Sequence, residues 1–160
     1  MPRPSGPASR ESLLDATRTL SRLASTVAAL LQESGVTLNQ YRILIHIMDA
    51  PLRAGDLAEM FGTSRPTLTA IIRGLERRGL VERKPVPDDG RGVTVHLTAL
   101  GLDAITAGDK RLQHFVSALT VGVGLPQFES MMSELEGPLD RQASLVRNRL
   151  STRQQRNEAT

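Results

Sequence analysis

Apolar positions recur with helical spacing along most of the chain and alternate with polar positions in one short segment. From residue 10 to residue 34 an apolar stripe advances by alternating steps of four and three residues, a mean period of about 3.5 that is typical of a helix packed lengthwise on another. Gly35 ends this segment. Residues 1–9, which precede the segment, are rich in Pro, Gly and Ser and are expected to be disordered. The stripe consists of Leu13, Thr17, Leu20, Ala24, Val27 and Leu31.

Three shorter helices are predicted next. Thr37 is suited to cap the first, and Pro51 stops it. The second covers about residues 53–61. Ser64 is a good N-cap for the third, and Gly79 is a natural residue just past its end.

A β-hairpin is predicted after these helices. Residues 81–86 read as one strand, residues 87–90 (Pro-Asp-Asp-Gly) as a turn, and residues 93–97 alternate Val, Val and Leu with polar residues. Three short helices followed by a hairpin form the order of a winged helix-turn-helix. We therefore assign residues 37–97 to a DNA-binding domain of this type.

Two further helical segments are predicted in residues 98–150, separated by the VGVG sequence at 121–124. Gly137-Pro138 is expected to kink or split the second, and residues 151–160 are expected to form a polar, frayed tail. The apolar stripes of residues 10–36 and 98–150 exceed what the small domain could cover, which predicts a homodimer built from these segments; a monomeric helical bundle is the alternative. The predicted fold class is mainly α with a small β-hairpin wing (α+β), a winged helix-turn-helix core flanked by N- and C-terminal dimerisation helices.

Composition narrows the possible functions. At 160 residues and 17.4 kDa the chain suits one domain with helical extensions, and aromatic residues make up only 2%, so the core is expected to be aliphatic. The absence of cysteine excludes disulfides, thiolate metal sites and thiol redox sensing. No segment is suited to span a membrane or to act as a secretory signal, so a cytoplasmic protein without membrane contact is expected.

The net charge of +3 is concentrated in one part of the chain. Residues 65–91 carry seven basic and four acidic side chains, whereas residues 1–64 and residues 92–160 are each neutral. A localised basic segment predicts binding to a polyanion. The alternative is a solvated face with a chance excess of arginine.

The helix after Ser64 has two different faces when residues are placed at about 100° intervals. Leu68, Ile72 and Leu75 centre the apolar face, and arginine, threonine and small residues occupy the opposite one, which suits the major groove of DNA. Asp89 is expected to brace the wing around Arg91, a generic polar turn being the alternative. The predicted DNA-binding residues are Ser64, Arg65, Thr67, Thr69, Arg73 and Arg77 on the helix, and Arg83, Lys84 and Arg91 on the hairpin.

Four sequence motifs carry a resemblance to a known family. LAEMFGTSRPTLT (57–69), GLERRGLVER (74–83), DDGR (88–91) and HLTALG (96–101) together resemble the MarR family of bacterial transcriptional regulators. The resemblance is strong over about residues 37–101 and extends to the flanking helices by pattern only. It implies an obligate homodimer, a palindromic double-stranded DNA operator, and a small-molecule effector, often aromatic or anionic, in a crevice between the dimer and DNA lobes. Many members are repressors.

Position by position, Ser64, Thr67 and Thr69 match the family's recognition-helix hydroxyls, and Asp89 and Arg91 match its wing Asp-x-Arg motif. Two departures concern base contacts. Ala70 stands where many members have a basic residue, and Arg73-Gly74 replaces a commoner acid–base pair. The operator sequence therefore does not follow from the resemblance.

Arg42 and His46, four residues apart on one helix, are the candidate effector-binding residues, with a solvated or structural pair as the alternative. The chain has no G-x-S-x-G, no Gly-rich phosphate loop and no HExxH motif, so we predict no catalytic residues, no cofactor and no enzyme activity. We expect a ligand-responsive homodimeric repressor. A zinc-responsive regulator of the same fold, using His46, His96 or His114 with carboxylates, is the alternative, although no spacing indicates such a site.

Overall fold

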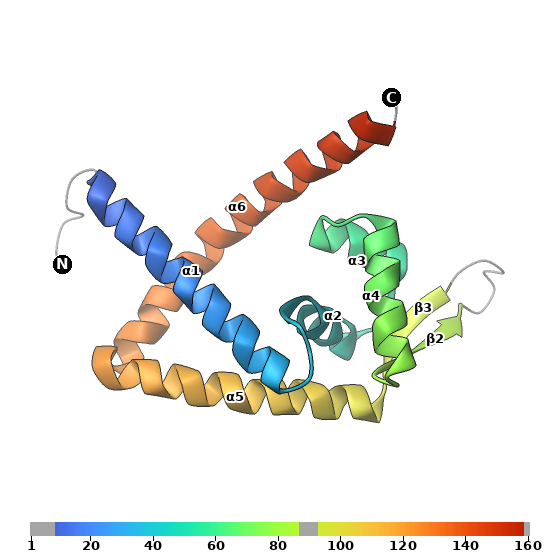
Figure 1. Ribbon diagram of the computed structural model, residues 1–160, viewed down its shortest axis with the longest axis horizontal. Coiled ribbons are helices and arrows are strands. Elements are labelled where there is room, and N and C mark those ends of the chain that lie inside the picture. The colour runs from blue at the N-terminus through green and yellow to red at the C-terminus, as the bar shows by residue number, and fades with distance from the viewer. Residues whose placement is uncertain (1–8, 87–92, 159–160) are drawn as a thin grey trace.

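The computed structural model describes residues 9–86 and 93–158 as a helical protein with a small antiparallel sheet (Figure 1). The mainly α fold with a β-hairpin wing is therefore confirmed. In chain order the elements are α1 (Arg10–Glu33), α2 (Leu38–Asp49), β1 (Leu52–Arg53), α3 (Ala54–Phe61), α4 (Arg65–Arg77), β2 (Val81–Pro85), β3 (Val93–Leu97), α5 (Ala99–Val123) and α6 (Leu125–Glu158).

Side-chain caps explain where several helices begin. Thr37 and Gln40 form a capping box at the start of α2, each side chain bonded to the other residue's backbone N–H. The Ser64 hydroxyl accepts a hydrogen bond from the third residue of α4, and the Thr98 hydroxyl does the same for α5. Gly62 ends α3 in the left-handed conformation with φ 58°, which permits the tight turn into α4.

The sheet has three strands in the order β1-β3-β2, all antiparallel. The predicted hairpin of β2 and β3 is present, with Arg83 opposite Val95. Strand β1 pairs with the other edge of β3 through Leu52 and Arg53, and it was not predicted. Two residues cannot display a period of two, so this strand exists only because the distant β3 provides its partner.

The hydrophobic core lies within residues 36–95 and is extended by one side chain from each of two flanking helices. Leu31 of α1 and Ile105 of α5 are 0% and 2% exposed and join the cluster of buried side chains from α2, α3, α4 and the sheet. Figure 1 shows α5 running along one side, with α2–α4 and the hairpin gathered at one of its ends and α6 returning from the other end. No described side chain of α6 is buried.

Two glycines of α5 permit its close approach to the winged helix-turn-helix domain. A Cβ atom added to Gly101 would lie 2.2 Å from the Leu80 carbonyl oxygen, so only glycine fits there without a backbone shift. A Cβ on Gly108 would lie 3.0 Å from side-chain carbons of Leu31 and Tyr41. The start of α5 is thus fixed against the base of the wing and against α1 and α2.

Gly137-Pro138 was expected to kink or split the helix, and the split does not occur, because α6 is a single helix with Pro138 inside it. Proline removes one backbone donor, and the carbonyl left without that donor can be satisfied by water where the helix is exposed, as it is here. The helix also continues through residues 151–158, which the sequence analysis assigned to a frayed tail.

Candidate nucleic-acid interface

Helix α4 presents the two faces that its sequence predicts. Leu68, Ile72 and Leu75 are at most 1% exposed, packed in the core. The residues on the opposite side, Pro66, Ala70, Arg73 and Arg77, are exposed. The face that is free to meet another molecule therefore carries two guanidinium groups and small side chains.

The N-terminal turn of α4 adds polar groups to this face. The Ser64 hydroxyl oxygen lies 3.2 Å from the Thr67 backbone nitrogen and 2.7 Å from the Thr67 hydroxyl. Arg65 and Thr67 are exposed, and Thr69 is half-buried. The positive end of the helix dipole, together with the exposed Arg65 side chain, makes such a turn favourable for a phosphate.

Two of the three predicted wing cations, Arg83 and Lys84, are paired with acidic side chains. The Arg83 Nε atom of β2 lies 3.4 Å from a carboxylate oxygen of Glu76 on α4. The Lys84 Nζ atom lies 2.6 Å from a carboxylate oxygen of Glu82. Both pairs are partly exposed, so water screens them and a phosphate could compete for either cation. Asp89 and Arg91 lie outside the described residues.

The candidate effector residues converge on Phe61 at the end of α3. The Arg42 guanidinium carbon lies 4.7 Å from the centre of the Phe61 ring, and the His46 ring centroid lies 5.0 Å from it. The His46 Nδ1 atom is 2.9 Å from the Arg42 carbonyl oxygen. The structure therefore places both side chains beside the α3–α4 turn, within the winged helix-turn-helix domain.

Tyr41, the residue before Arg42, provides the polar contact between α2 and α5. Its hydroxyl donates a hydrogen bond to the Asp109 carboxylate. Burial, then this hydrogen bond, then the negative charge of Asp109 raise the pKa of Tyr41 well above its ordinary value. No local sequence pattern predicts this contact, because the two residues are 68 positions apart.

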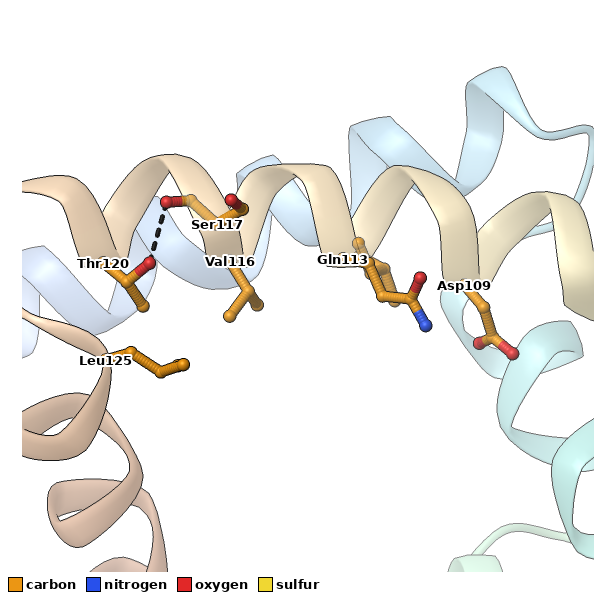
Figure 2. A pocket seen from close by; sticks show the side chains of 7 residues that line it. Asp109, Gln113, Val116, Ser117, Thr120 and Leu125 are labelled. Atoms are coloured by element: carbon orange, nitrogen blue, oxygen red, sulfur yellow. Dashed lines mark hydrogen bonds between the residues drawn. The ribbon is translucent and has the colours of Figure 1, made fainter.

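Asp109 also borders an open groove of about 400 Å³ along α5. Figure 2 shows Gln113 and Val116 on the same side of this helix, with Leu125 at the start of α6 closing one end. Leu112 completes the largely apolar lining. None of the described residues that line the groove is basic.

Arg78 has a structural role that the charge count did not reveal. Its guanidinium donates a 2.6 Å hydrogen bond to the Gly35 carbonyl and lies 3.5 Å from the Gln40 side-chain oxygen. It thus ties the end of α4 to the connection between α1 and α2.

Two features of residues 9–86 and 93–158 bear on other functions. No group of three or more histidine, aspartate or glutamate side chains there is placed to hold a metal ion, and the zinc-responsive alternative stays an untested prediction. None of the helices in these residues has the length and apolar character needed to cross a membrane.

A winged helix-turn-helix with long flanking helices is the class that this geometry defines. A family model described as MarR family matches residues 34–92, which include the core of this domain. Together with the fold, the match makes this part of the chain similar to the MarR family of transcriptional regulators.

Individual relatives agree with this assignment. The HTH-type transcriptional repressor YetL of Bacillus subtilis (strain 168) is 29% identical over 85 residues, which cover 51% of this chain and only 47% of the relative. The transcriptional regulator Tm0710 from Thermotoga maritima is 27% identical, with a TM-score of 0.57 over 82% of this chain and 98% of that one. The structure of NadR in complex with 4-hydroxyphenylacetate is 28% identical, with a TM-score of 0.63 over 89% and 98% of the two chains.

Proposed function

We propose that this protein is a transcriptional regulator of the MarR family, a homodimeric repressor acting in the cytoplasm. It would bind a palindromic DNA operator and release it when a small aromatic or anionic effector binds. The observation that carries DNA binding is the exposed Arg73 and Arg77 face of α4, next to the hydroxyl-rich turn at Ser64. Such a face suits the major groove, where arginine can contact guanine edges or phosphates. The repressor role is supported by the similarity to YetL.

Dimerisation is supported by the apolar surface of the flanking helices. Of the nineteen large apolar side chains that are exposed in the described residues, sixteen lie on α1, α5 and α6. A two-fold dimer would place two copies of α4 roughly 34 Å apart, one turn of DNA. Sedimentation equilibrium should give twice the chain mass of 17.4 kDa, and a mass of one chain at every concentration would contradict the dimer.

Footprinting on the protein's own upstream region tests DNA binding. Arg73→Ala should weaken binding about tenfold or more, because one arginine contact contributes about 1–3 kcal/mol. Arg91→Ala should also weaken it and lower the salt slope by about one. Lys110→Ala removes the same charge from exposed α5 and is the matched control. Unchanged affinity in both arginine variants at fixed salt would contradict the proposal.

The effector class is proposed from two observations. Arg42 and Phe61 bring a cation and an aromatic ring together in the DNA-binding domain. A relative of similar fold, NadR, has been crystallised with 4-hydroxyphenylacetate, an aromatic anion. Repeating the footprinting in the presence of aromatic acids tests the proposed effector class. A footprint that none of these acids changes would contradict that class.

A further inference from the structure

Charge is sharply divided along α6. Residues 125–140, the first half of this helix, carry four acidic and no basic side chains. Residues 141–157 carry five arginines and no acidic side chain. The sign changes between Asp140 and Arg141, at the middle of the 34-residue helix. The neutral total of residues 92–160 therefore includes one helix with two oppositely charged halves.

Apolar side chains follow the same helix, and this chain does not cover them. Met132, Leu135, Leu139 and Val146 recur at helical spacing and are 36–61% exposed. No described side chain of α6 is buried, and none forms an ion pair with another described residue. Figure 1 shows the helix leaving one end of α5 and continuing to the C-terminus. Apolar surface and unpaired charge are thus both available to a partner.

The charges of α6 complement those of a second α6 that runs in the opposite direction. When two antiparallel copies cross at residue 141, a position before 141 lies opposite the position equally far after it. Glu134 then lies opposite residue 148, next to Arg149. Asp140 lies opposite residue 142, next to Arg141. Acidic positions of each copy therefore meet basic positions of the other.

The apolar positions are complementary about the same centre. Leu139 lies opposite Ala143, and Leu135 lies opposite residue 147, next to Val146. A single crossing point thus brings apolar positions together and opposite charges together. A parallel pair of helices would place acid opposite acid and arginine opposite arginine, which is unfavourable. The sequence of α6 therefore favours the antiparallel order.

The balance of charge on α6 distinguishes between the possible occupants of its surface. The whole helix carries five basic and five acidic residues. DNA, or any partner with charge of one sign, would be attracted by one half of the helix and repelled by the other. A second copy of α6 matches both halves, and a two-fold axis repeats every contact.

We propose that α6 pairs with α6 of a second copy in antiparallel order, crossing near residue 141, and that its divided charge selects this partner. The inference rests on the proposed homodimer and specifies how its longest helices meet. A chain whose last helix lacks this division of charge would pair less well, so the pattern also acts against mixed dimers. Because the charges are exposed, the pairing weakens as salt is added.

Charge reversal on either half of α6 tests the pairing. One double variant has Glu134→Lys with Asp140→Lys, and the other has Arg141→Glu with Arg149→Glu. At about 0.05 M salt, each alone should self-associate about tenfold more weakly or worse by sedimentation equilibrium. An equimolar mixture should recover most of the lost affinity, because the new lysines then face the new glutamates. Thermal melting followed by circular dichroism shows that each variant is folded.

A matched control places the same change of charge outside the flanking helices. Asp49→Lys with Glu59→Lys alters exposed positions of α2 and α3, and it should leave self-association within about twofold. Undiminished self-association of both α6 variants would overturn the proposal. A mixture of the two that associates no more strongly than either variant alone would also overturn it.

Single cysteines test the antiparallel order directly, because the chain has no cysteine of its own. In Gln142→Cys the two new cysteines would be offset by about 3 Å along the helices, within reach of a disulfide. Leu135→Cys lies two turns earlier on the same face, where the offset would be about 18 Å and no disulfide can form. Oxidation should therefore cross-link only Gln142→Cys. Equal cross-linking of both variants would indicate a parallel pair and overturn the proposal, as would the absence of any cross-link.

The same variants separate this inference from the proposed function. A dimer that charge reversal does not weaken would contradict the pairing of α6 and leave the homodimer intact. A dimer that depends on α6 but has no affinity for its upstream DNA would support the pairing and contradict the repressor. If Arg141→Glu with Arg149→Glu weakens duplex binding and leaves self-association unchanged, these arginines contact DNA and the proposal is overturned.

Discussion

The winged helix-turn-helix domain and the flanking helices differ in how they use their apolar side chains. Thirteen of the fifteen buried core side chains lie between residues 36 and 95, whereas sixteen of the nineteen exposed large apolar side chains lie on α1, α5 and α6. The domain covers its own core, and the helices present apolar surface to solvent. The exposed apolar side chains of the helices favour a partner surface that would cover them. The winged helix-turn-helix domain needs no such partner, because its own apolar side chains are already buried.

The largest predicted effect tests this division with two leucines. Leu75→Ala, at a side chain that is 0% exposed, should lower the free energy of unfolding by about 2–5 kcal/mol, because it removes buried contacts and leaves a cavity. Leu139→Ala, at a side chain that is 61% exposed in α6, should cost less and should weaken the dimer. Urea unfolding at several protein concentrations measures both.

The dependence of each stability loss on protein concentration distinguishes the two variants. Stability lost through Leu139→Ala should shrink on dilution, and stability lost through Leu75→Ala should persist. An equal loss at every concentration in both variants would contradict the division into a closed domain and helices that need a partner.

A smaller effect is expected where the two regions meet. Gly101→Ala should destabilise the chain by about 1–3 kcal/mol, because the added Cβ would lie 2.2 Å from the Leu80 carbonyl and force α5 away from the wing. Gly55→Ala is the matched control, since a Cβ there meets no atom within 4 Å. Thermal unfolding of both variants gives the comparison, and equal melting temperatures would show that the contact can relax freely.

Short-range features were predictable from the sequence, and long-range contacts were not. The buried face of α4 follows from helical spacing, and the Thr37 and Ser64 caps follow from residue type at a boundary. Strand β1 and the contact between Tyr41 and Asp109 depend on residues many positions away, so no local pattern predicts them. The continuation of the helix through Pro138 was also not predicted. The sequence does not show that this part of the helix is exposed, so that water can reach its backbone.

Only part of the candidate site could be predicted from the sequence, again because local spacing does not reveal long-range contacts. Periodicity identified the exposed Arg73 and Arg77, but the count of charges could not separate them from Arg78, which bonds to the Gly35 carbonyl. The position of Arg42 over Phe61 depends on the packing of α2 against α3, which one sequence does not reveal. The assigned DNA-binding and effector roles stay predictions.

Tyr41→Phe should cost about 1 kcal/mol near neutral pH, because it removes the hydrogen bond to Asp109 that joins the two regions. The folded protein raises the pKa of Tyr41, so its neutral form stabilises the fold fully below the ordinary pKa near 10. That stabilisation declines as the pH rises above 10 toward the folded pKa. Urea unfolding at about pH 8 and about pH 11 should therefore show the gap between wild type and Tyr41→Phe narrowing. A gap that is constant with pH would contradict the effect.

The smallest effect on stability is predicted for the ion pair between Arg83 and Glu76, which links the wing to α4. The atoms are 3.4 Å apart and both side chains are partly exposed, so either Arg83→Gln or Glu76→Gln should cost less than about 1 kcal/mol. Their effects on duplex binding should be opposite. Arg83→Gln removes a cation available to phosphate and should weaken binding, whereas Glu76→Gln frees the same cation and should strengthen it. Weaker binding in both variants would show that the pair acts by positioning the wing, because a phosphate contact by Arg83 requires the two changes to differ in sign.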